Sequence, residues 1–208
     1  MRRTDTRRAV VATLVLGLAA GVGCKPWTVR PIEDRSSGTP SSSGRFDAAA
    51  YVASIWAARV VAAANTSASE IGPGWPADRS RSAPAVFVRG AGTVLQVDRR
   101  SRVGLALLDL APLDGRADVA LQIGPVLRGT ALRDALPFIR FGDFANQIEY
   151  ADVASALNAR VLLEALNAVD SASLEGRTVS FRGAVKPGGT SASGLPEIVP
   201  VVLQGGAP

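Results

Sequence analysis

The densest group of polar side chains in the sequence lies between residues 122 and 152. Its members are Gln122, Arg128, Arg133, Asp134, Arg140, Asp143, Asn146, Gln147, Glu149 and Asp152. Arginine side chains present planar donor forks that suit a carboxylate, a phosphate or sugar hydroxyls, and side-chain amides offer paired donors and acceptors. The same residue types also satisfy the backbone groups of a long connection between elements. The group is therefore either a recognition surface or a structural network.

We divide these two roles by residue. The candidate binding residues are Gln122, Arg128, Asn146 and Gln147. Among these, we expect Arg128 and Asn146 to be exposed and functional. The neighbouring opposite charges Arg133 and Asp134 are expected to be structural.

The composition is compatible with few enzyme mechanisms. The chain has no His and one Cys, which excludes His metal ligands, a Ser-His-Asp triad, an imidazole acid or base, and an internal disulfide. The Gly-containing run at 124–129 matches neither a phosphate-binding loop nor a dinucleotide-binding fingerprint. We therefore expect a non-enzymatic protein without a metal or a cofactor.

One catalytic alternative stays open, because Asp134 with Asp143, or Glu149 with Asp152, has the chemistry of a glycosidase acid pair. The other interpretation is that these acids interact with the dipole at the N-terminus of a helix.

The N-terminus has the pattern of a secretion signal. Four arginines within the first eight residues precede an uncharged run at 9–22, which is shorter than the roughly 20 apolar residues of a membrane-spanning helix. The only cysteine, Cys24, follows where a bacterial lipoprotein is cleaved and acylated, although Gly21 stands where that pattern prefers Leu. We expect residues 1–23 to be removed and Cys24 to carry a lipid; ordinary signal cleavage with a free thiol is the alternative.

The mature chain has the length of one domain and a tether. Removing residues 1–23 from the 208-residue chain leaves 185, enough for a single core. Residues 24–45 are rich in Ser, Gly and Pro and predict a flexible tether that spans about 25 Å; residues 46–208 form the domain.

The mature chain has 19 Lys and Arg and 17 Asp and Glu, a net charge of +2. With no aromatic stacking series on its strands, we expect no nucleic-acid partner.

Hydrophobic periodicity predicts two helices. The first runs from Asp47, its N-cap, to about Ala64, with Phe46 stapled against Tyr51. The second runs from about Ala151 to Val169. We expect its Leu157 to lie in one core with Phe181 of a nearby strand.

Alternating apolar residues predict five strands. The first, Val86–Asp98, changes phase around Gly90 and Gly92, as a strand does where it bends. The others cover residues 103–107, 119–123, 178–185 and 198–203, and Pro200 favours an edge position for the last. Residues 65–84 and 186–196 are predicted loops. The order corresponds to an α+β fold: an OB-like five-stranded barrel with a helix between strands 3 and 4 and an added N-terminal helix.

One stretch resembles a known family. The run QIGPVLRGTALRD at 122–134, followed by Phe141, Phe144, Asn146-Gln147 and Ala151-Asp152-Val153, is similar to the core of DUF2291, a family of predicted periplasmic lipoproteins. The resemblance implies an exported, anchored protein without established catalytic residues. It also implies a link to carbohydrate uptake, because genes of the family often lie beside those of sugar ABC transporters.

These observations lead to one expected function and two alternatives. We expect an envelope lipoprotein, anchored through Cys24, that acts as a binding or accessory module for carbohydrate ABC-transporter uptake, with transporter components or a small carbohydrate as partners. Because Lys25 rather than Asp follows Cys24, a Gram-negative host would place it in the outer membrane. A structural envelope interaction protein, with an exposed apolar patch and no pocket, is the first alternative. An envelope enzyme acting on glycans, with two facing carboxylates in a cleft, is the second.

Overall fold

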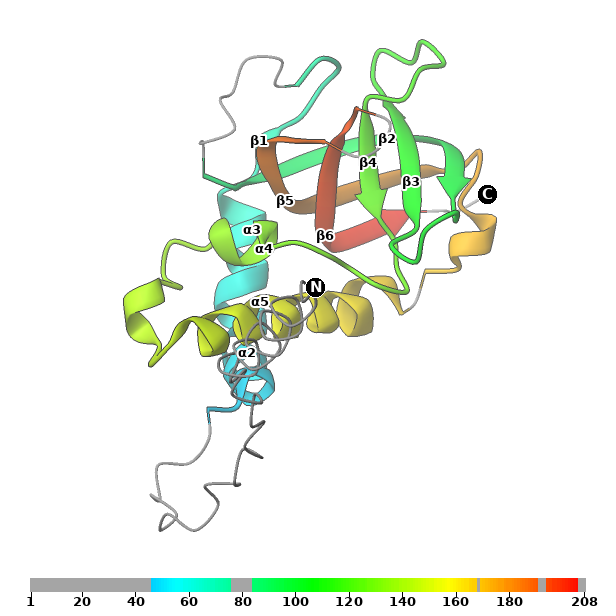
Figure 1. Cartoon of the computed structure of the whole chain (residues 1–208). Helices are drawn as coiled ribbons and strands as arrows, with labels where there is room; N and C mark the ends of the chain where they lie inside the picture. Colours follow the sequence, from blue (N-terminus) through cyan, green and yellow to red (C-terminus); the bar gives the residue numbers. More distant parts are fainter. Residues whose placement is uncertain (1–45, 76–83, 168, 191–193, 206–208) are drawn as a thin grey trace, which may run out of the picture. The chain divides into compact units, whose positions relative to one another are not determined.

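A computed structural model describes residues 46–75, 84–167, 169–190 and 194–205. The predicted signal peptide, Cys24 and the predicted tether lie outside the described residues. Within them the elements follow the expected order of three strands, a helix and two strands, preceded by a helix. Figure 1 shows the strands wrapped into a barrel, with the helices on one side of it.

The N-terminal helix forms as its sequence predicts. It comprises α2 (Ala48–Ile55), the π-helical segment η1 (Trp56–Val61) and α3 (Ala62–Thr66). The Asp47 carboxylate caps it by accepting hydrogen bonds from the Ala49 and Ala50 amides at 2.9 and 3.0 Å. The rings of Phe46 and Tyr51 lie 5.9 Å apart, which confirms the predicted staple. This helix is long and apolar enough to cross a membrane by length and composition alone, but its Val52 to Val60 face is buried in the domain.

Five strands close the barrel: β2 (Val86–Asp98), β3 (Leu105–Leu110), β4 (Val119–Gln122), β6 (Pro196–Gly205) and β5 (Thr178–Thr190). They pair in the order β2-β3-β4-β6-β5, and β5 returns to β2. All of these pairs are antiparallel except β4 with β6, which is parallel. A two-residue strand, β1 (Ser69–Glu70), pairs with β2 inside the predicted 65–84 loop.

Strand β2 serves two neighbours, as its change of phase predicted. Val86 to Thr93 pair with β5, and Gly92 to Asp98 pair with β3. Gly92 lies where the two ladders overlap, and a Cβ there would collide with the carbonyl oxygen of Asp109. The irregularity in the β3 ladder, however, lies between Val94 and Gln96 and not at Gly90.

The last two strands differ from the prediction. Strand β5 continues to Thr190, so part of the predicted 186–196 loop is strand. Strand β6 lies between β4 and β5, so its predicted edge position is wrong. Its Pro200 is accommodated because pairing with β4 involves only Glu197 and Ile198, and because the β5 ladder shifts register beside Pro200.

The second helix begins earlier than predicted. It comprises α5 (Gln147–Val161) and the π-helical segment η3 (Leu162–Leu166), and its N-cap is Asn146. The connection before it holds α4 (Ala131–Asp134) and the 3-10 turn η2 (Phe141–Asp143). Another 3-10 turn, η4 (Ser171–Ser173), precedes β5.

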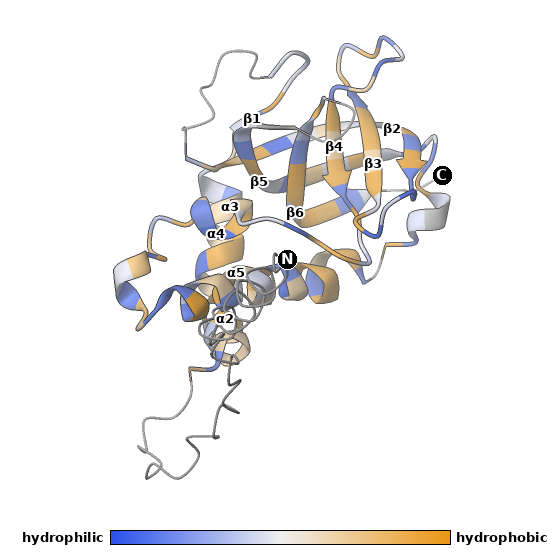
Figure 2. Ribbon diagram, viewed as in Figure 1, coloured by the Kyte–Doolittle hydropathy of each residue, from blue (hydrophilic) through white to orange (hydrophobic). Residues whose placement is uncertain are grey.

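Two large clusters of buried residues, and a small third one of Val103, Leu105 and Ala120, form the core of the described residues. The barrel interior contains Val119, Leu121 and Ile123 of the third strand, as alternation predicted, together with Phe181. The helical core lies between the helices and the outer face of the sheet, and it contains Leu157. Leu157 and Phe181 therefore belong to different clusters, and the expectation of one shared core is wrong. Figure 2 shows the hydrophobic residues along β3, β4 and β6 and on the helices beside them.

Candidate functional site

The segment from Gly124 to Thr130 follows β4, passes alongside α5 and leads into α4. Its backbone is held at one end by the Val126 amide, which donates to the Arg102 carbonyl at 3.0 Å. Gly124 has a φ of 82°, and a Cβ there would approach Leu162 of η3 to 2.9 Å. This glycine therefore lets the segment pass close beneath the helix.

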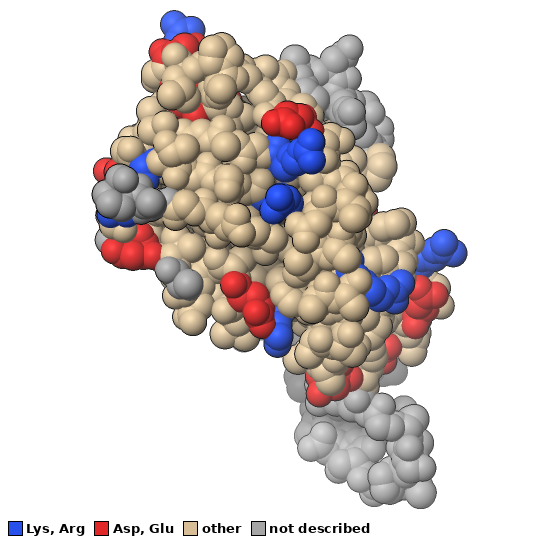
Figure 3. All heavy atoms as spheres, turned by 180° about the vertical axis from the view of Figure 1, so that it is seen from behind, with Lys and Arg blue, Asp and Glu red and all other residues tan. Residues whose placement is uncertain are grey.

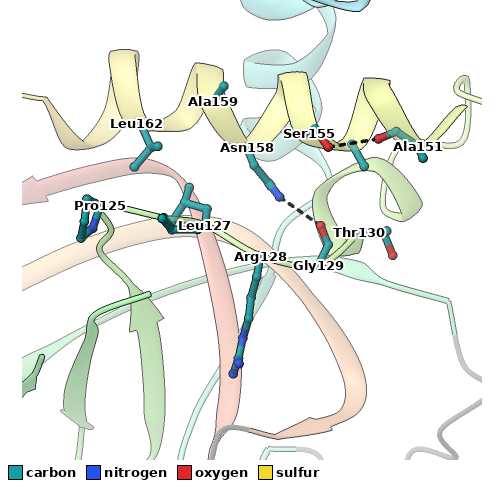
Figure 4. A pocket seen from close by; sticks show the side chains of 12 residues that line it. Pro125, Leu127, Arg128, Gly129, Thr130, Ala151, Ser155, Asn158, Ala159 and Leu162 are labelled. Atoms are coloured by element: carbon teal, nitrogen blue, oxygen red, sulfur yellow. Dashed lines mark hydrogen bonds between the residues drawn. The ribbon is translucent and has the colours of Figure 1, made fainter. Parts of the chain in front are cut away.

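A groove of about 460 Å³ lies between this segment and α5. Two types of surface line it: the segment itself, and a row of mostly small residues on the helix. The lining residues are Pro125, Val126, Leu127, Arg128, Gly129, Thr130, Ala151, Ala154, Ser155, Asn158, Ala159 and Leu162. Figure 4 shows the side chains of Asn158 and Leu162 directed from the helix toward the segment. The small helical residues leave the space that makes up the groove.

Asn158 is the polar residue at the base of the groove. Its side chain is buried, with 7% of the residue exposed, and its Nδ2 donates to the Gly129 carbonyl at 3.0 Å (Figure 4). This bond fixes the amide and joins helix to segment. The Oδ1 atom makes no hydrogen bond within the described part of the chain, so an acceptor remains available at the groove.

A charged network lies on the other side of the segment. Arg128 donates from Nε and Nη2 to the two carboxylate oxygens of Glu197, at 3.1 and 2.8 Å. The buried Gln122 donates to Glu197 at 2.7 Å and exchanges two hydrogen bonds with the Arg128 backbone, at 2.8 and 3.2 Å. The hydrogen bonds to Glu197 raise the pKa of Arg128. A smaller hollow of about 240 Å³ adjoins this network and is also lined by Lys186.

The network changes the interpretation of Gln122. This residue is only 3% exposed, and its amide is used by Glu197 and by the Arg128 backbone. Gln122 also lines the hollow of about 240 Å³, and its role as a binding residue stays a prediction. Arg128 has a side chain that is 58% exposed, as expected, although it is ion-paired. Ligand binding by Arg128 stays a prediction.

Asn146 and Gln147 lie away from this network. The Asn146 side chain accepts hydrogen bonds from the Ile148 and Glu149 amides at 2.9 and 3.0 Å, as an N-cap does. Gln147 is the first residue of α5 and is exposed. Neither residue lines the groove. The structure thus brings Gln122 and Arg128 together and places the other two candidates at the start of the helix.

Arg133 and Asp134 form an ion pair, with Arg133 Nη2 2.7 Å from Asp134 Oδ1. The Asp134 carboxylate also accepts a hydrogen bond from Thr130 at 2.7 Å. The Arg133 guanidinium lies 3.8 Å from the centre of the Tyr150 ring, and its Nη1 donates to the Tyr150 carbonyl. These contacts join α4 to the first turn of α5.

One acid from each of the two candidate catalytic pairs, Asp143 and Glu149, binds a local backbone group. Asp143 accepts a hydrogen bond from the Arg140 amide at 3.2 Å, and Glu149 accepts one from the Ala145 amide at 3.0 Å. The residues that line the groove include no Asp or Glu. Each of these two acids therefore caps a turn or helix of the connection.

Sequence reasoning missed two residues of the site, Asn158 and Glu197. Asn158 had a detectable signal, because it is a polar residue next to Leu157 on the apolar face of a predicted helix. Glu197 had none, since it lies 69 residues from Arg128 in the sequence and only the fold brings the two together.

Two comparisons with known proteins found a match, one to a protein family and one to a solved structure. A family model described as a predicted periplasmic lipoprotein, DUF2291, matches residues 78–204. The solved structure of an OB-fold protein from Thermotoga maritima is similar, with a TM-score of 0.52 and 16% identity over 77% of this chain and 99% of that chain. At this identity the likeness shows the fold alone, and it confirms the OB-like barrel. No curated protein matches the chain.

Proposed function

Because the chain belongs to the DUF2291 family of predicted periplasmic lipoproteins, we propose that it is a lipid-anchored binding module of the cell envelope. In this proposal it is an accessory to carbohydrate uptake by an ABC transporter and not an enzyme. The groove between α5 and residues 124–130 is the observation that carries the binding role. Its volume of about 460 Å³ is within the range of small-molecule sites.

The chemistry of the groove favours binding over catalysis. Its one charged residue, Arg128, is neutralised by Glu197. The remaining polar groups are the Asn158 amide, the hydroxyls of Ser155 and Thr130, and backbone groups of the segment. Such neutral donors and acceptors suit a ligand rich in hydroxyls, whereas acid–base chemistry requires an ionisable group in reach of the ligand.

We place the lipid on Cys24 and, in a Gram-negative host, the protein in the outer membrane, because Lys25 follows the cysteine. The mature protein should then begin at an acylated Cys24, and Cys24→Ala should release it from the membrane fraction or leave the precursor uncleaved. Mass spectrometry of the mature N-terminus tests this directly. An unmodified thiol at Cys24 would contradict it.

The binding role is tested by filling the groove. Ser155 is exposed on the groove side of α5, so Ser155→Trp should block the groove without disturbing the core. Ser54→Trp is a matched control, because Ser54 is also an exposed helical serine whose hydroxyl donates to its own helix, and it lies outside the groove. Membranes carrying each full-length variant are solubilised, and the proteins recovered with it are identified by mass spectrometry.

The expected result is that sugar-transporter subunits are recovered with the wild-type chain and with Ser54→Trp, and are lost with Ser155→Trp. A panel of mono- and disaccharides, measured by the shift of the melting temperature, tests direct ligand binding in the same three proteins. Recovery of the same subunits with Ser155→Trp, together with unchanged responses to sugars, would exclude the groove as the functional site.

A structural interaction protein is a second candidate, favoured by two large exposed apolar residues near the start of α5. Phe141 is 55% exposed and Ile148 is 72% exposed. Phe141 also packs edge-on against Tyr150, with the ring centres 5.5 Å apart. If this role is correct, Ile148→Ser should abolish partner recovery while Ser155→Trp leaves it intact.

A further inference from the structure

A second hollow lies on the outer face of the barrel, where β1, β2, β5 and β6 meet. Its volume is about 230 Å³, and its lining includes Glu70, Arg89, Ala91, Ser180, Arg182 and Val202. None of these residues lines the groove beside α5. The hollow is therefore separate from the candidate binding site described above.

Two arginines face each other across this hollow. Arg89 of β2 and Arg182 of β5 are direct partners in the antiparallel ladder, so their side chains leave the sheet side by side. The next pair on the same face, Phe87 with Ala184, is buried in the helical core. The arginines thus stand where the helical cover of the sheet ends. Like charges directly opposite each other in a sheet are destabilising, so this arrangement has a cost unless an anion lies between them.

The described part of the chain provides little compensation for the two charges. Glu70 contacts Arg89 alone, through one Nε to Oε2 distance of 3.3 Å, and the two side chains are 52% and 76% exposed. Exposed pairs of this kind contribute little stability. The side chain of Arg182, whose backbone pairs with β2 and β6, makes no hydrogen bond or ion pair with any residue within 46–75, 84–167, 169–190 or 194–205. Figure 3, which views the molecule from behind, shows small groups of basic and acidic side chains separated by uncharged surface.

We propose that the Arg89–Arg182 hollow is a binding site for a phosphate group. Two guanidinium forks on adjacent strands can each donate two hydrogen bonds to different oxygens of one tetrahedral anion. The Ser180 hydroxyl, on the same face of β5 and across from Ala91, supplies a further donor. A bound phosphate would also remove the repulsion between the two arginines. The phosphate belongs either to a soluble compound or to the headgroup of a membrane lipid.

The test uses the mature, lipidated chain in a phosphate-free maltoside detergent at constant ionic strength. Inorganic phosphate is titrated and its heat of binding is measured. Arg182→Gln should weaken binding about tenfold or more, the effect of losing one bidentate charged contact, and Arg89→Gln should do the same. Arg102→Gln is the matched control, because Arg102 is an exposed arginine on a turn away from the hollow; it should stay within about twofold of the wild type, as expected for screened surface charge.

A second measurement separates this site from a structural role. In phosphate-free buffer, Arg182→Gln should melt no lower than the wild type, because it removes a like-charge contact. Phosphate should raise the melting temperatures of the wild type and of Arg102→Gln, and that of Arg182→Gln much less. Absence of saturable binding, or an equal loss in Arg102→Gln, would overturn the proposal. So would a lowered melting temperature of Arg182→Gln with unchanged phosphate affinity.

A third measurement distinguishes a soluble phosphate compound from a lipid headgroup. The wild-type protein is placed in nanodiscs that contain phosphatidylglycerol, and inorganic phosphate is titrated again. Binding as tight as in detergent supports a soluble phosphate compound. Binding weaker than in nanodiscs that carry the same negative charge on a fatty acid, which corrects for repulsion of phosphate by the anionic surface, shows that the lipid headgroup occupies the hollow. The hollow and the groove beside α5 share no lining residue. Ser155→Trp, which should block the groove, should therefore leave phosphate binding unchanged.

Discussion

In the barrel interior, alternate residues of one strand point to the same centre, as Val179, Phe181 and, beyond Gly183, Val185 do on β5. The helical core is assembled differently. It takes Val153, Leu157 and Val161 from one stripe of α5 and adds residues from the outer faces of the strands, including Val199 and Val201 of β6. The two regions share strands but use opposite faces of them.

This difference explains why the two regions were not equally predictable. A barrel interior follows from the two-residue period of each strand by itself. A core between a helix and a sheet requires knowing which strands are covered on both faces. Strand β6 is such a strand, since Ile198 belongs to the barrel interior and Val199 to the helical core. It therefore appears in the sequence as a continuous apolar run.

The largest effect is expected in the barrel interior. Phe181→Ala should lower the free energy of unfolding by about 3 to 5 kcal/mol, because the residue is only 2% exposed and removal of its ring leaves a cavity. Ser180→Ala, on the outer face of the same strand, should have little effect. Urea unfolding measures both. Similar losses of stability at the two positions would show that the inner and outer faces of β5 are assigned incorrectly.

A somewhat smaller effect is expected in the helical core, where Leu157→Ala should cost about 2 to 5 kcal/mol. Leu157 is fully buried, and it lies in a different cluster from Phe181. The losses in the double variant should therefore add to within about 0.5 kcal/mol. A coupling well above this value, measured by the same urea unfolding, would mean that the two clusters act as one core.

The edge of the helical core should be less sensitive. Asn146→Ala removes the N-cap of α5 and should cost about 1 kcal/mol. Gln147→Ala, one residue further on and exposed, should change stability by less than about 0.5 kcal/mol. Thermal unfolding of both variants distinguishes the cap from a surface residue. If Asn146→Ala melts like the wild type, the cap contributes nothing measurable, and the binding role predicted for Asn146 gains support.

The smallest effect concerns the turn at the end of β2. Side-chain and backbone hydrogen bonds from Arg100 lower the pKa of Asp98 to about 2. Because the folded pKa is lowered, the pair's contribution to stability is present above about pH 4, the pKa of an unpaired Asp, and is lost as the pH falls toward 2. Carboxyl NMR titration should find this midpoint, and Arg100→Gln should raise it. An unchanged midpoint in Arg100→Gln would exclude the ion pair as the cause.

Local patterns determined much of the fold. The Asp47 cap and the Phe46–Tyr51 contact depend on residues within one helical turn or so, and the bounds of β2 follow from one run of alternating residues. The order of the elements was sufficient to indicate the OB-like barrel. The start of α5 was misplaced because several residues before Ala151 can cap a helix, and only the folded backbone shows that Asn146 does so.

The candidate site was less predictable, because its contacts join distant parts of the chain. The sequence by itself determined that residues 122–134 carry amide and guanidinium groups, and that the composition leaves few catalytic mechanisms. Only the tertiary structure decided that Gln122 is buried, that Arg128 pairs with Glu197, and that small residues of α5 leave a groove above the segment. The physical reason is that a side chain's partner depends on strand order and helix placement, which result from the whole core and not from the residues on either side.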